Sequence, residues 1–244
     1  MVEGGRVLAT AIEAGADIES VYAAPGAAER PGTLELLERV QELGARVAYL
    51  AAGVIERVAD TVTPQPVMAV VRIPEQPSTV LATASLALVC VEVRDPGNVG
   101  TLIRTAAAAG ADVVVCCEGT ADPYSPKCVR ASSGAVFLVP VIAGASAEPV
   151  LCSLESFGLF RLGAVARGGS APEGYDLSQP VAIVVGNEST GLPVLLSGSL
   201  DGMATIPMPG RAESLNVGAA AAVLCFEVAR QRRTAAIPAA PGRQ

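Results

Sequence analysis

Short segments that are apolar along their whole length recur through the last two thirds of the chain. Residues 86–93, 112–117 and 181–185 are strand-length runs of this kind, and segments with helical patterning, such as 98–109, lie between them. Strands that are apolar on both faces occur in parallel sheets that helices cover on both sides. The pattern therefore predicts an α/β fold with a mostly parallel sheet. Further strands are expected at 136–141, 161–166 and 204–207, and further helices at 127–133, 150–157, 194–199 and 215–232.

The chain divides into two α/β parts joined by a short connector. Residues 1–73 alternate helical and strand patterns and are predicted to form a small domain. Residues 74–84 contain Pro, Ser and Thr and show weak periodicity, which is typical of a linker. The larger domain is expected at 85–233, and the Pro- and Ala-rich end, 234–244, is expected to be disordered. Within the small domain, helices are expected at 3–14 and 33–43 and strands at 18–23, 46–50 and 67–71.

The chain has no histidine, and this absence excludes several kinds of active site. Ser-His-Asp catalysis, Cys-His catalysis and histidine metal sites are ruled out, which leaves carboxylates, Arg, Ser, Asn and backbone groups for any chemistry. The six cysteines show no Cys-x-x-Cys spacing and lie mostly in apolar runs, as reduced and buried thiols do. We therefore expect no metal site.

The net charge of −7 argues against a protein that binds nucleic acid indiscriminately. The acidity is concentrated in residues 1–75, which carry eleven acidic residues against six arginines. Sixteen of the seventeen basic residues in the chain are arginines. Because a planar guanidinium can bind phosphate through two hydrogen bonds, a few well-placed side chains could still hold an RNA backbone.

Nothing in the sequence indicates a membrane protein. The longest apolar runs are the length of a strand and fall far short of a membrane span. The N-terminus lacks the basic and then apolar pattern of a signal peptide. A cytoplasmic protein with no membrane partner is expected.

Three loop segments combine Gly and Pro with polar side chains. In the third of them, which runs from Ile206 to Arg230, a short strand leads through a Pro- and Gly-containing loop into a helix of small residues, with Ser214 at the N-cap position. Ser214, Asn216 and the free N–H groups at this helix start form a site suited to a polar ligand or an anion. Neither Gly-x-Gly-x-x-Gly nor Gly-x-x-x-x-Gly-Lys occurs, which argues against a Rossmann dehydrogenase or a P-loop ATPase. The segments are Asp95-Pro-Gly-Asn-Val-Gly-Thr-Leu-Ile-Arg104, Ile183-Val-Val-Gly-Asn-Glu-Ser-Thr-Gly-Leu-Pro193 and the stretch from Ile206 to Arg230.

In order and wording, these segments resemble the three motifs of the SpoU (TrmH) branch of the SPOUT superfamily, the S-adenosylmethionine-dependent RNA ribose 2′-O-methyltransferases. The resemblance covers residues 85–233. It implies a C-terminal domain with a trefoil knot, S-adenosylmethionine as the cofactor without a metal, and ribosomal RNA favoured over transfer RNA as substrate. It also implies a homodimer through the catalytic domain, in which the second subunit completes the site.

The residues ahead of the motifs look like the start of the ribosomal-protein-like domain that many of these enzymes carry. In the family, this domain helps to select the RNA. A purely structural or dimer-stabilising role is an equal alternative here because the small domain is negatively charged.

The resemblance also implies which residues hold the cofactor, whose adenine is bound mainly by backbone groups. Gly186 would let the cofactor approach the backbone closely, and Ile206 and Leu215 would form apolar walls for a purine. The alternative is that these are turn and core residues. The full expected set is Gly163, Val165, Gly186, Asn187, Ile206, Met208 and Leu215.

Arg104 is the residue expected to carry the chemistry. A guanidinium stays protonated, so Arg104 is not a simple base. We expect its fork to hold a phosphate and the ribose oxygen while the phosphate, Glu188 or water takes the proton. Two alternatives stay open: Asn98 also suits an N-cap, and Glu188 could form a structural ion pair with Arg104 or Arg211. The expected catalytic set is Arg104, Asn98, Glu188, Ser214 and Asn216.

A segment from Asp122 to Ser133 resembles a family segment that faces RNA. Lys127, Arg130 and Ser132 are therefore predicted to contact phosphate, although an ordinary solvated surface explains them equally well. Two rival functions remain. One is an RNA-binding protein that has kept the fold and lost catalysis, and the other is a methyltransferase that acts on a base or a small molecule.

Overall fold

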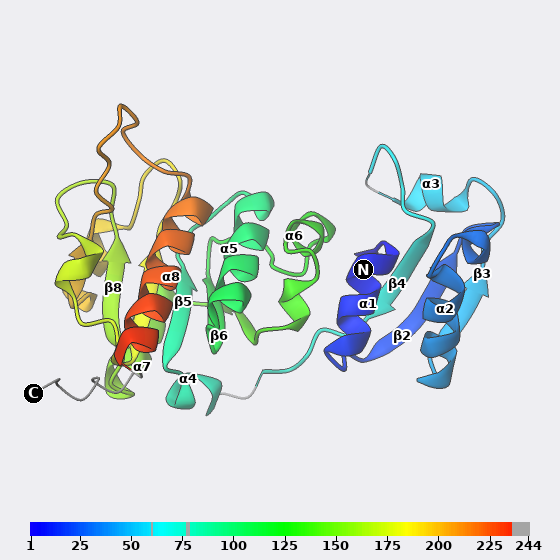
Figure 1. Cartoon of the computed structure of the whole chain (residues 1–244), viewed down its shortest axis with the longest axis horizontal. Helices are drawn as coiled ribbons and strands as arrows, with labels where there is room; N and C mark the ends of the chain where they lie inside the picture. Colours follow the sequence, from blue (N-terminus) through cyan, green and yellow to red (C-terminus); the bar gives the residue numbers. More distant parts are fainter. Residues whose placement is uncertain (60, 77–78, 236–244) are drawn as a thin grey trace, which may run out of the picture.

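The computed structural model of the chain describes residues 1–59, 61–76 and 79–235. It contains two sheets, each with its own helices, which lie side by side along the long axis of the molecule (Figure 1). Within these residues, the N-terminal sheet has four strands and the C-terminal sheet has six. Every pair of neighbouring strands in the larger sheet is parallel, so the predicted α/β fold is confirmed.

The smaller sheet has the strand order β1-β4-β2-β3. Two of its strands have the predicted bounds, 18–23 and 67–71. The helix expected at 3–14 begins two residues later, because the first residues of the chain pair with β4 as a short antiparallel strand. Its elements are β1 (Val2–Glu3), α1 (Gly5–Glu13), β2 (Ile18–Ala23), a 3-10 turn (Ala27–Glu29), α2 (Thr33–Glu42), β3 (Arg46–Tyr49), α3 (Val54–Val58) and β4 (Val67–Val71).

The larger sheet has the order β10-β8-β9-β5-β6-β7 and follows a short helix, α4 (Thr79–Thr83), that lies inside the expected connector. Its strands are β5 (Leu86–Cys90), β6 (Val113–Cys117), β7 (Val141–Ala145), β8 (Phe160–Ala164), β9 (Val181–Val185) and β10 (Gly202–Ala204). Its helices are α5 (Pro96–Ala109), α6 (Pro126–Ala131), α7 (Ala147–Ser156) and α8 (Val217–Ala235), with 3-10 turns at Ala135–Phe137, Pro172–Gly174 and Val194–Ser199.

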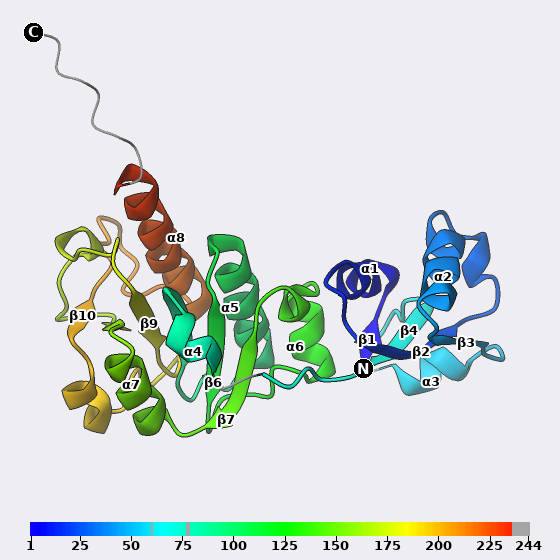
Figure 2. The same cartoon turned by 90° about the horizontal axis from the view of Figure 1, so that it is seen from below.

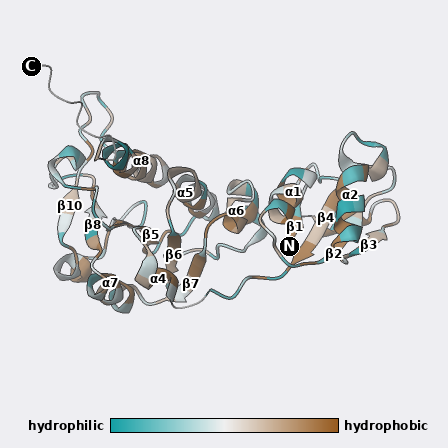
Figure 3. Cartoon of the chain, turned by 60° about the horizontal axis from the view of Figure 1, so that its bottom comes forward, coloured by the Kyte–Doolittle hydropathy of each residue, from teal (hydrophilic) through white to brown (hydrophobic). Residues whose placement is uncertain are grey.

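Alternate residues of the central strands face two separate cores. Leu88 and Ile183 pack with α5 and α8, whereas Ala87, Val89 and Ala182 pack with α7. Figure 2 shows α5 and α8 on one side of the sheet and α7 on the other, and Figure 3 shows hydrophobic colour on the strands β6 and β7. This two-sided burial explains why the strands are apolar along their whole length. Among the helices described, none is both long enough and apolar enough to span a membrane.

Three predicted segments require correction. The strand expected at 204–207 is β10 at Gly202–Ala204, which ends where the expected strand begins. The strand expected at 136–141 is instead a buried 3-10 turn, and β7 begins only at Val141. Val136, Val139 and Val141 of this run are buried, which a turn allows as well as a strand does, whereas Leu138 is 58% exposed. The expected disordered end, 234–244, begins inside α8, which continues to Ala235. Residues 236–244 lie outside the described part of the chain.

The short strand β10 is enclosed by the segment that follows β8. One side of Gly202–Ala204 pairs in parallel with β8, and Ala204 also pairs in parallel with Ser170. The Ser170 N–H donates to the Met203 carbonyl at 2.9 Å, and the Tyr175 hydroxyl donates to the same carbonyl at 2.8 Å. The chain between β8 and Tyr175 therefore passes around β10.

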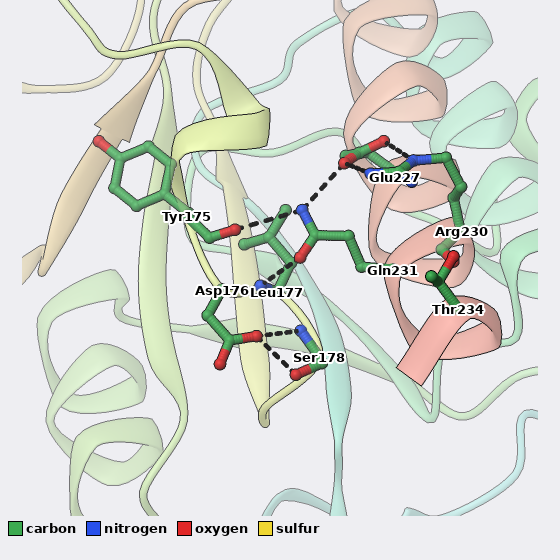
Figure 4. Close-up of polar contacts among 8 residues, drawn as sticks. All are labelled: Tyr175, Asp176, Leu177, Ser178, Glu227, Arg230, Gln231 and Thr234. Atoms are coloured by element: carbon green, nitrogen blue, oxygen red, sulfur yellow. Dashed lines mark hydrogen bonds and ion pairs between the residues drawn. The ribbon is translucent and has the colours of Figure 1, made fainter. Parts of the chain in front are cut away.

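The same segment is fastened to α8 through Gln231 (Figure 4). The Gln231 Oε1 atom accepts a hydrogen bond from the Leu177 backbone N–H at 2.8 Å. Its Nε2 atom donates to the Tyr175 carbonyl at 3.2 Å and to the Glu227 carboxylate at 2.9 Å. Arg230 in turn donates two hydrogen bonds to Glu227. These bonds hold the loop around β10 against the last helix.

The two sheets are connected through the buried carboxylate of Glu3 in β1. Glu3 accepts hydrogen bonds from the Thr61 hydroxyl at 2.7 Å and from the Gln65 N–H at 3.1 Å. Arg130 of α6 forms an ion pair with the other carboxylate oxygen at 3.3 Å. Because the Glu3 side chain is only 5% exposed, this contact ties the small domain firmly to α6.

Candidate active site

A cavity of about 510 Å³ lies where three adjacent strands of the larger sheet end. The carboxyl ends of β8, β9 and β10 lead into its walls, and the first turns of α8 close it. Ligands of open parallel sheets bind at the carboxyl ends of the strands. The lining residues are Ala164, Val165, Ala166, Val185, Gly186, Asn187, Glu188, Ser189, Thr190, Gly191, Leu192, Ala204, Ile206, Met208, Ser214, Leu215, Asn216, Val217, Ala220 and Leu224.

Of the seven residues expected to hold a cofactor, only Gly163 does not line this cavity. Gly163 lies in β8, where a Cβ would lie 2.8 Å from a Leu200 methyl and 3.0 Å from a Leu192 methyl. Glycine is required here because the Leu200 and Leu192 side chains pack directly on the strand, and the expected contact of Gly163 with a cofactor stays a prediction. The other six line the cavity together, and their contact with a cofactor stays a prediction.

The loop after β9 closes tightly on itself. A Cβ on Gly186 would lie 2.4 Å from the carbonyl carbon of Gly191, closer than atoms can approach. Asn187 and Gly191 exchange backbone hydrogen bonds of 3.1 and 2.9 Å, and the Asn187 side-chain oxygen accepts from the N–H groups of Ser189 and Thr190. The Asn187 amide also donates to the Glu92 carbonyl at 2.9 Å. Gly186 and Asn187 therefore build the loop that forms this wall.

Three of the expected catalytic residues, from three distant segments, join in one chain of hydrogen bonds. Asn216 Nδ2 donates to Asn98 Oδ1 at 3.0 Å, and Asn98 Nδ2 donates to Glu188 Oε1 at 2.8 Å. Burial disfavours the ionised form of Glu188, but the bond from Asn98 and bonds from nearby backbone N–H groups outweigh it and hold its pKa below the usual value. Glu188 is therefore an ionised acceptor at neutral pH and a weak base.

The start of α8 differs from the expectation. The helix begins at Val217, and the Asn216 side-chain oxygen accepts from the Gly218 N–H at 2.9 Å. Asn216 is thus the N-cap, and Ser214, expected there, lies two residues too early and is exposed at the rim of the cavity. One amide side chain caps the helix and reaches the network at the same time.

The start of α5 also has a different cap. Asp95 is the N-cap, accepting from the Asn98 N–H at 3.0 Å, and Asn98 lies within the first turn of the helix. The Lys127 ammonium pairs with Asp95 at 3.0 Å, and hydrogen bonds from Lys127 and from the Asn98 backbone lower the Asp95 pKa. The Asn98 side chain is consequently free for the network. The Asp-Pro pair before a helix was the signal for this cap, and sequence reasoning missed it.

Arg104 is separated from that network. It lies six residues beyond Asn98 on α5, about 9 Å along the helix axis and a third of a turn around it. The guanidinium is exposed and donates to the Ser133 hydroxyl at 3.4 Å. In the described part of the chain, Glu188 forms no ion pair with Arg104 or with Arg211, so the structure does not bear out that alternative.

The three residues expected to contact phosphate differ in how accessible they are in the structure. Ser132 is fully buried and its hydroxyl donates to the Val129 carbonyl at 2.9 Å, so it cannot reach an RNA phosphate and that prediction is wrong. Arg130 is largely occupied by Glu3. Lys127 keeps 60% of its side chain exposed beside Asp95, and it is the member of the set best placed to contact RNA.

Sequence reasoning also missed part of the cavity wall on α8. Ala220 and Leu224 follow Asn216 at intervals of four residues, so all three lie on one side of the helix. This periodicity was the available signal. Among the residues that the structure describes, possible metal ligands do not gather in groups of three or more.

Comparison with known proteins gives a family match for each of the two parts of the chain. Residues 85–226 match the model of the SpoU rRNA Methylase family, and residues 1–77 match the model for RNA 2′-O ribose methyltransferase substrate binding. A relative from Bacillus subtilis, the 23S rRNA (guanosine(2553)-2′-O)-methyltransferase RlmP, is 37% identical over 187 residues, 77% of this chain and 74% of that protein. The 23S rRNA (guanosine-2′-O-)-methyltransferase RlmB of Xanthomonas axonopodis is 31% identical over 95% of this chain and 96% of its own length.

Solved structures agree with this assignment. The AdoMet-bound rRNA methyltransferase from Sinorhizobium meliloti superposes with a TM-score of 0.80 at 30% identity, over 93% of this chain and 85% of that one. The sequence match to the family model extends over more than half of the chain and includes all three loop segments that build the cavity and the network. The chain therefore belongs to the SpoU rRNA methylase family.

Proposed function

We propose that this protein transfers a methyl group from S-adenosylmethionine to a ribose 2′-hydroxyl of 23S ribosomal RNA. The observation that carries the proposal is the junction of Asn98, Glu188 and Asn216 at the rim of a cavity formed by the carboxyl ends of three parallel strands. A relative that matches 95% of the chain is named as a 23S rRNA (guanosine-2′-O-)-methyltransferase, which supports the choice of RNA. No metal is needed, because methyl transfer from a sulfonium is an in-line displacement that depends mainly on positioning.

The cavity suits the proposed cofactor in size and lining. Its volume of about 510 Å³ falls in the range of small-molecule sites. Ile206 and Leu215 offer apolar surface for an adenine ring, and the loops supply backbone groups for its polar edge. Six of the seven residues expected to hold the cofactor line this one space.

When bound, S-adenosylmethionine would supply an electrophilic methyl group at the rim. The chain's own residues must then hold the ribose oxygen in line, and its proton must pass to an acceptor. Glu188 is a poor acceptor for that proton because its pKa is lowered and its carboxylate already accepts from Asn98. Arg104 stays protonated and stabilises the developing negative charge. The proton therefore passes to an RNA phosphate or to water, while Glu188 orients Asn98.

We further propose a homodimer formed through the catalytic domain. Ala219, Val223 and Phe226 form an exposed stripe on α8, and the last two are 43% and 47% exposed although both are apolar. The separation of Arg104 from the network of its own chain supports a site in which one subunit supplies Arg104 and the other supplies the cavity. The passage of the chain around β10 supports the proposed trefoil knot.

The small domain, residues 1–73, is proposed to select the RNA, with 74–84 as the connector and 85–233 as the catalytic domain. Its docking on α6 through Glu3 would hold a bound RNA at a fixed place relative to the site. A cytoplasmic location follows from the proposed ribosomal substrate.

Filling the cavity tests the cofactor assignment. Gly186→Val is unsuitable, because its side chain would collide with Gly191 and break the loop. Ala220→Leu places a larger side chain in the cavity from a helix that tolerates leucine. We expect this variant to lose S-adenosylmethionine binding in calorimetric titration, whereas Ala108→Leu, on the exposed side of α5, retains it. Unchanged affinity in a folded Ala220→Leu protein would refute the assignment.

Mass spectrometry of nucleosides tests the reaction itself. The substrate is an unmodified transcript of the 23S rRNA gene from the same genome, treated with the wild-type protein and labelled S-adenosylmethionine. We expect the label in a 2′-O-methylnucleoside. Label in a methylated base would instead support the second rival function, and absence of cofactor binding by the wild-type protein would support an RNA-binding protein without catalysis.

The dimer is tested by charge substitution. Val223→Glu should convert the dimer to a monomer in light scattering, and Val62→Glu, at a fully exposed valine of the small domain, should leave a dimer. A shared site makes a further prediction for two variants with strongly reduced activity, Arg104→Lys and Asn216→Asp. After subunit exchange, half of the dimers are mixed and half of their sites are intact, so about a quarter of wild-type activity should return. No recovery would show that Arg104 acts within its own subunit.

A further inference from the structure

Ser133 has a backbone conformation that its side chain does not favour. Its φ of 52° is left-handed, and within the described residues only Glu92 shares this property among non-glycine residues. Ser133 follows the C-cap residue of α6, and this position is usually glycine because a Cβ is unfavourable there. Gly134, the next residue, also has a positive φ, of 86°. A serine at this position calls for an explanation in terms of its hydroxyl group.

The Ser133 hydroxyl accepts a hydrogen bond from Arg104 Nη1 at 3.4 Å. In the part of the chain that the structure describes, this is the one side-chain partner of the Arg104 guanidinium. A hydroxyl is a neutral acceptor, so it restricts the direction of the guanidinium without neutralising its charge. A carboxylate in the same place would form an ion pair and weaken the attraction of Arg104 for phosphate. The remaining N–H groups of Arg104 stay available.

The turn that carries Ser133 is held rigidly on two sides. On one side, a Cβ on Gly100 of α5 would lie 2.5 Å from the Ala131 methyl, so α5 and α6 are packed at the closest possible distance. On the other side, a Cβ on Gly134 would lie 3.0 Å from the Cβ of Thr10 in α1. These close contacts restrict movement of Ser133 relative to the helix that carries Arg104. A rigid support of this kind is what a precisely aimed catalytic group requires.

We propose that Ser133 is a positioning residue that aims the Arg104 guanidinium at the phosphate and ribose oxygen of the RNA. This inference rests on the proposed function, since it assigns a task to Ser133 only if Arg104 takes part in methyl transfer. It also explains why a strained serine occupies a position that glycine would fill with less strain.

Ser133→Gly separates the hydroxyl from the backbone conformation, because glycine adopts a positive φ freely. We expect a melting temperature equal to or above that of the wild type and an unchanged Kd for S-adenosylmethionine. The single-turnover rate with the 23S rRNA transcript should fall about tenfold, as expected for the loss of a hydrogen bond to a charged group. Ser133→Asn should recover most of the rate, because asparagine tolerates the left-handed conformation and offers a neutral oxygen. Ser156→Gly, at the end of α7, is the matched control and should keep full activity.

A double variant distinguishes positioning from a structural role. If Ser133 acts through Arg104, then Ser133→Gly should change the rate less than about twofold in an Arg104→Lys background. The inference would be overturned if the rate of the double variant fell by the product of the two single-variant reductions. It would also be overturned if the rate of Ser133→Gly stayed within about twofold of wild type. The proposed function would stand in both cases. A wild-type protein that binds S-adenosylmethionine but methylates no RNA would overturn both.

Discussion

Replacing Asn216 in two ways separates its structural contribution from its functional one. The side-chain oxygen of Asn216 caps α8 at the Gly218 N–H, and its amide donates to Asn98. Asn216→Ala removes both bonds. Asn216→Asp keeps an oxygen for the cap, and its negative charge suits a helix N-terminus, but it has no donor for Asn98. If the Asn98 amide keeps its orientation, it has no donor from residue 216. If it rotates so that its NH2 group donates to the new carboxylate, it loses its hydrogen bond to Glu188. Either way, one hydrogen bond of the network is lost.

The two substitutions should affect stability differently. Loss of the cap reduces the free energy of unfolding by about 1 kcal/mol, and loss of an exposed hydrogen bond reduces it by about a further 0.5 kcal/mol. For a chain of this size, Asn216→Ala should lower Tm by about 3–6 °C. Asn216→Asp should stay within about 2 °C of wild type because the cap remains. Both variants should reduce the methyl-transfer rate by about tenfold or more through the broken network.

Thermal unfolding should be followed by circular dichroism, since the chain has no tryptophan for fluorescence. Methyl transfer from labelled S-adenosylmethionine to the 23S rRNA transcript gives the rate. The cap assignment fails if Asn216→Asp is destabilised as strongly as Asn216→Ala. The functional role of the network fails if Asn216→Asp is stable and fully active.

Three further predictions concern other parts of the molecule. Arg104→Lys keeps the charge but loses the fork, so it should retain S-adenosylmethionine binding while the single-turnover rate falls about a hundredfold; a rate within a few-fold of wild type would remove Arg104 from catalysis. Hydrogen bonds from Arg161 hold the pKa of Asp201 below its usual value, so the stability they contribute is present above pH about 4 and is lost as the pH falls through the folded-state pKa. Asp201→Asn should therefore lower Tm at pH 7, and the gap to wild type should narrow in acid; a constant gap would contradict this linkage. Arg130→Gln should lower Tm by leaving Glu3 buried without its ion pair while RNA affinity changes little, and a loss of affinity at unchanged Tm would restore Arg130 as a phosphate contact.

Apolar periodicity located strands well where both faces of the strand are buried. The bounds of β9 and of β4 were predicted to the residue because polar or Pro-containing turns flank a continuous apolar run. The same rule failed at 136–141, where Val136 and Val139 are buried although the chain forms a 3-10 turn at Ala135–Phe137 and β7 begins only at Val141. An apolar run indicates that a segment is buried. It indicates a strand only where the backbone of the segment can pair with a neighbouring strand. There, Ser133 and Gly134 adopt positive φ values and turn the chain before pairing begins at Val141.

Helix caps show a similar limit. The sequence predicted the cap of α8 at Ser214 and that of α5 at Asn98, whereas the structure has Asn216 and Asp95 in these roles. All four residue types can cap a helix, so local preference does not choose between them. In each helix, the capping residue is the one whose side chain reaches an N–H group of the first turn, so the cap depends on where the helix starts. That start depends on packing of the helix against the sheet.

The sequence by itself determined the two-sided burial of the larger sheet, the absence of histidine chemistry and the loops from which the site is built. Tertiary structure alone decided which side chains meet. Asn98 lies 90 residues from Glu188 and 118 from Asn216, yet all three join because the segments that follow the parallel strands β5, β9 and β10 converge at one edge of the sheet. It also placed Ser132 inside the protein and turned Arg130 toward Glu3, although both looked like surface residues in the sequence. Residue type limits the chemistry that a side chain can perform, but its partners depend on contacts between segments that are far apart in the chain.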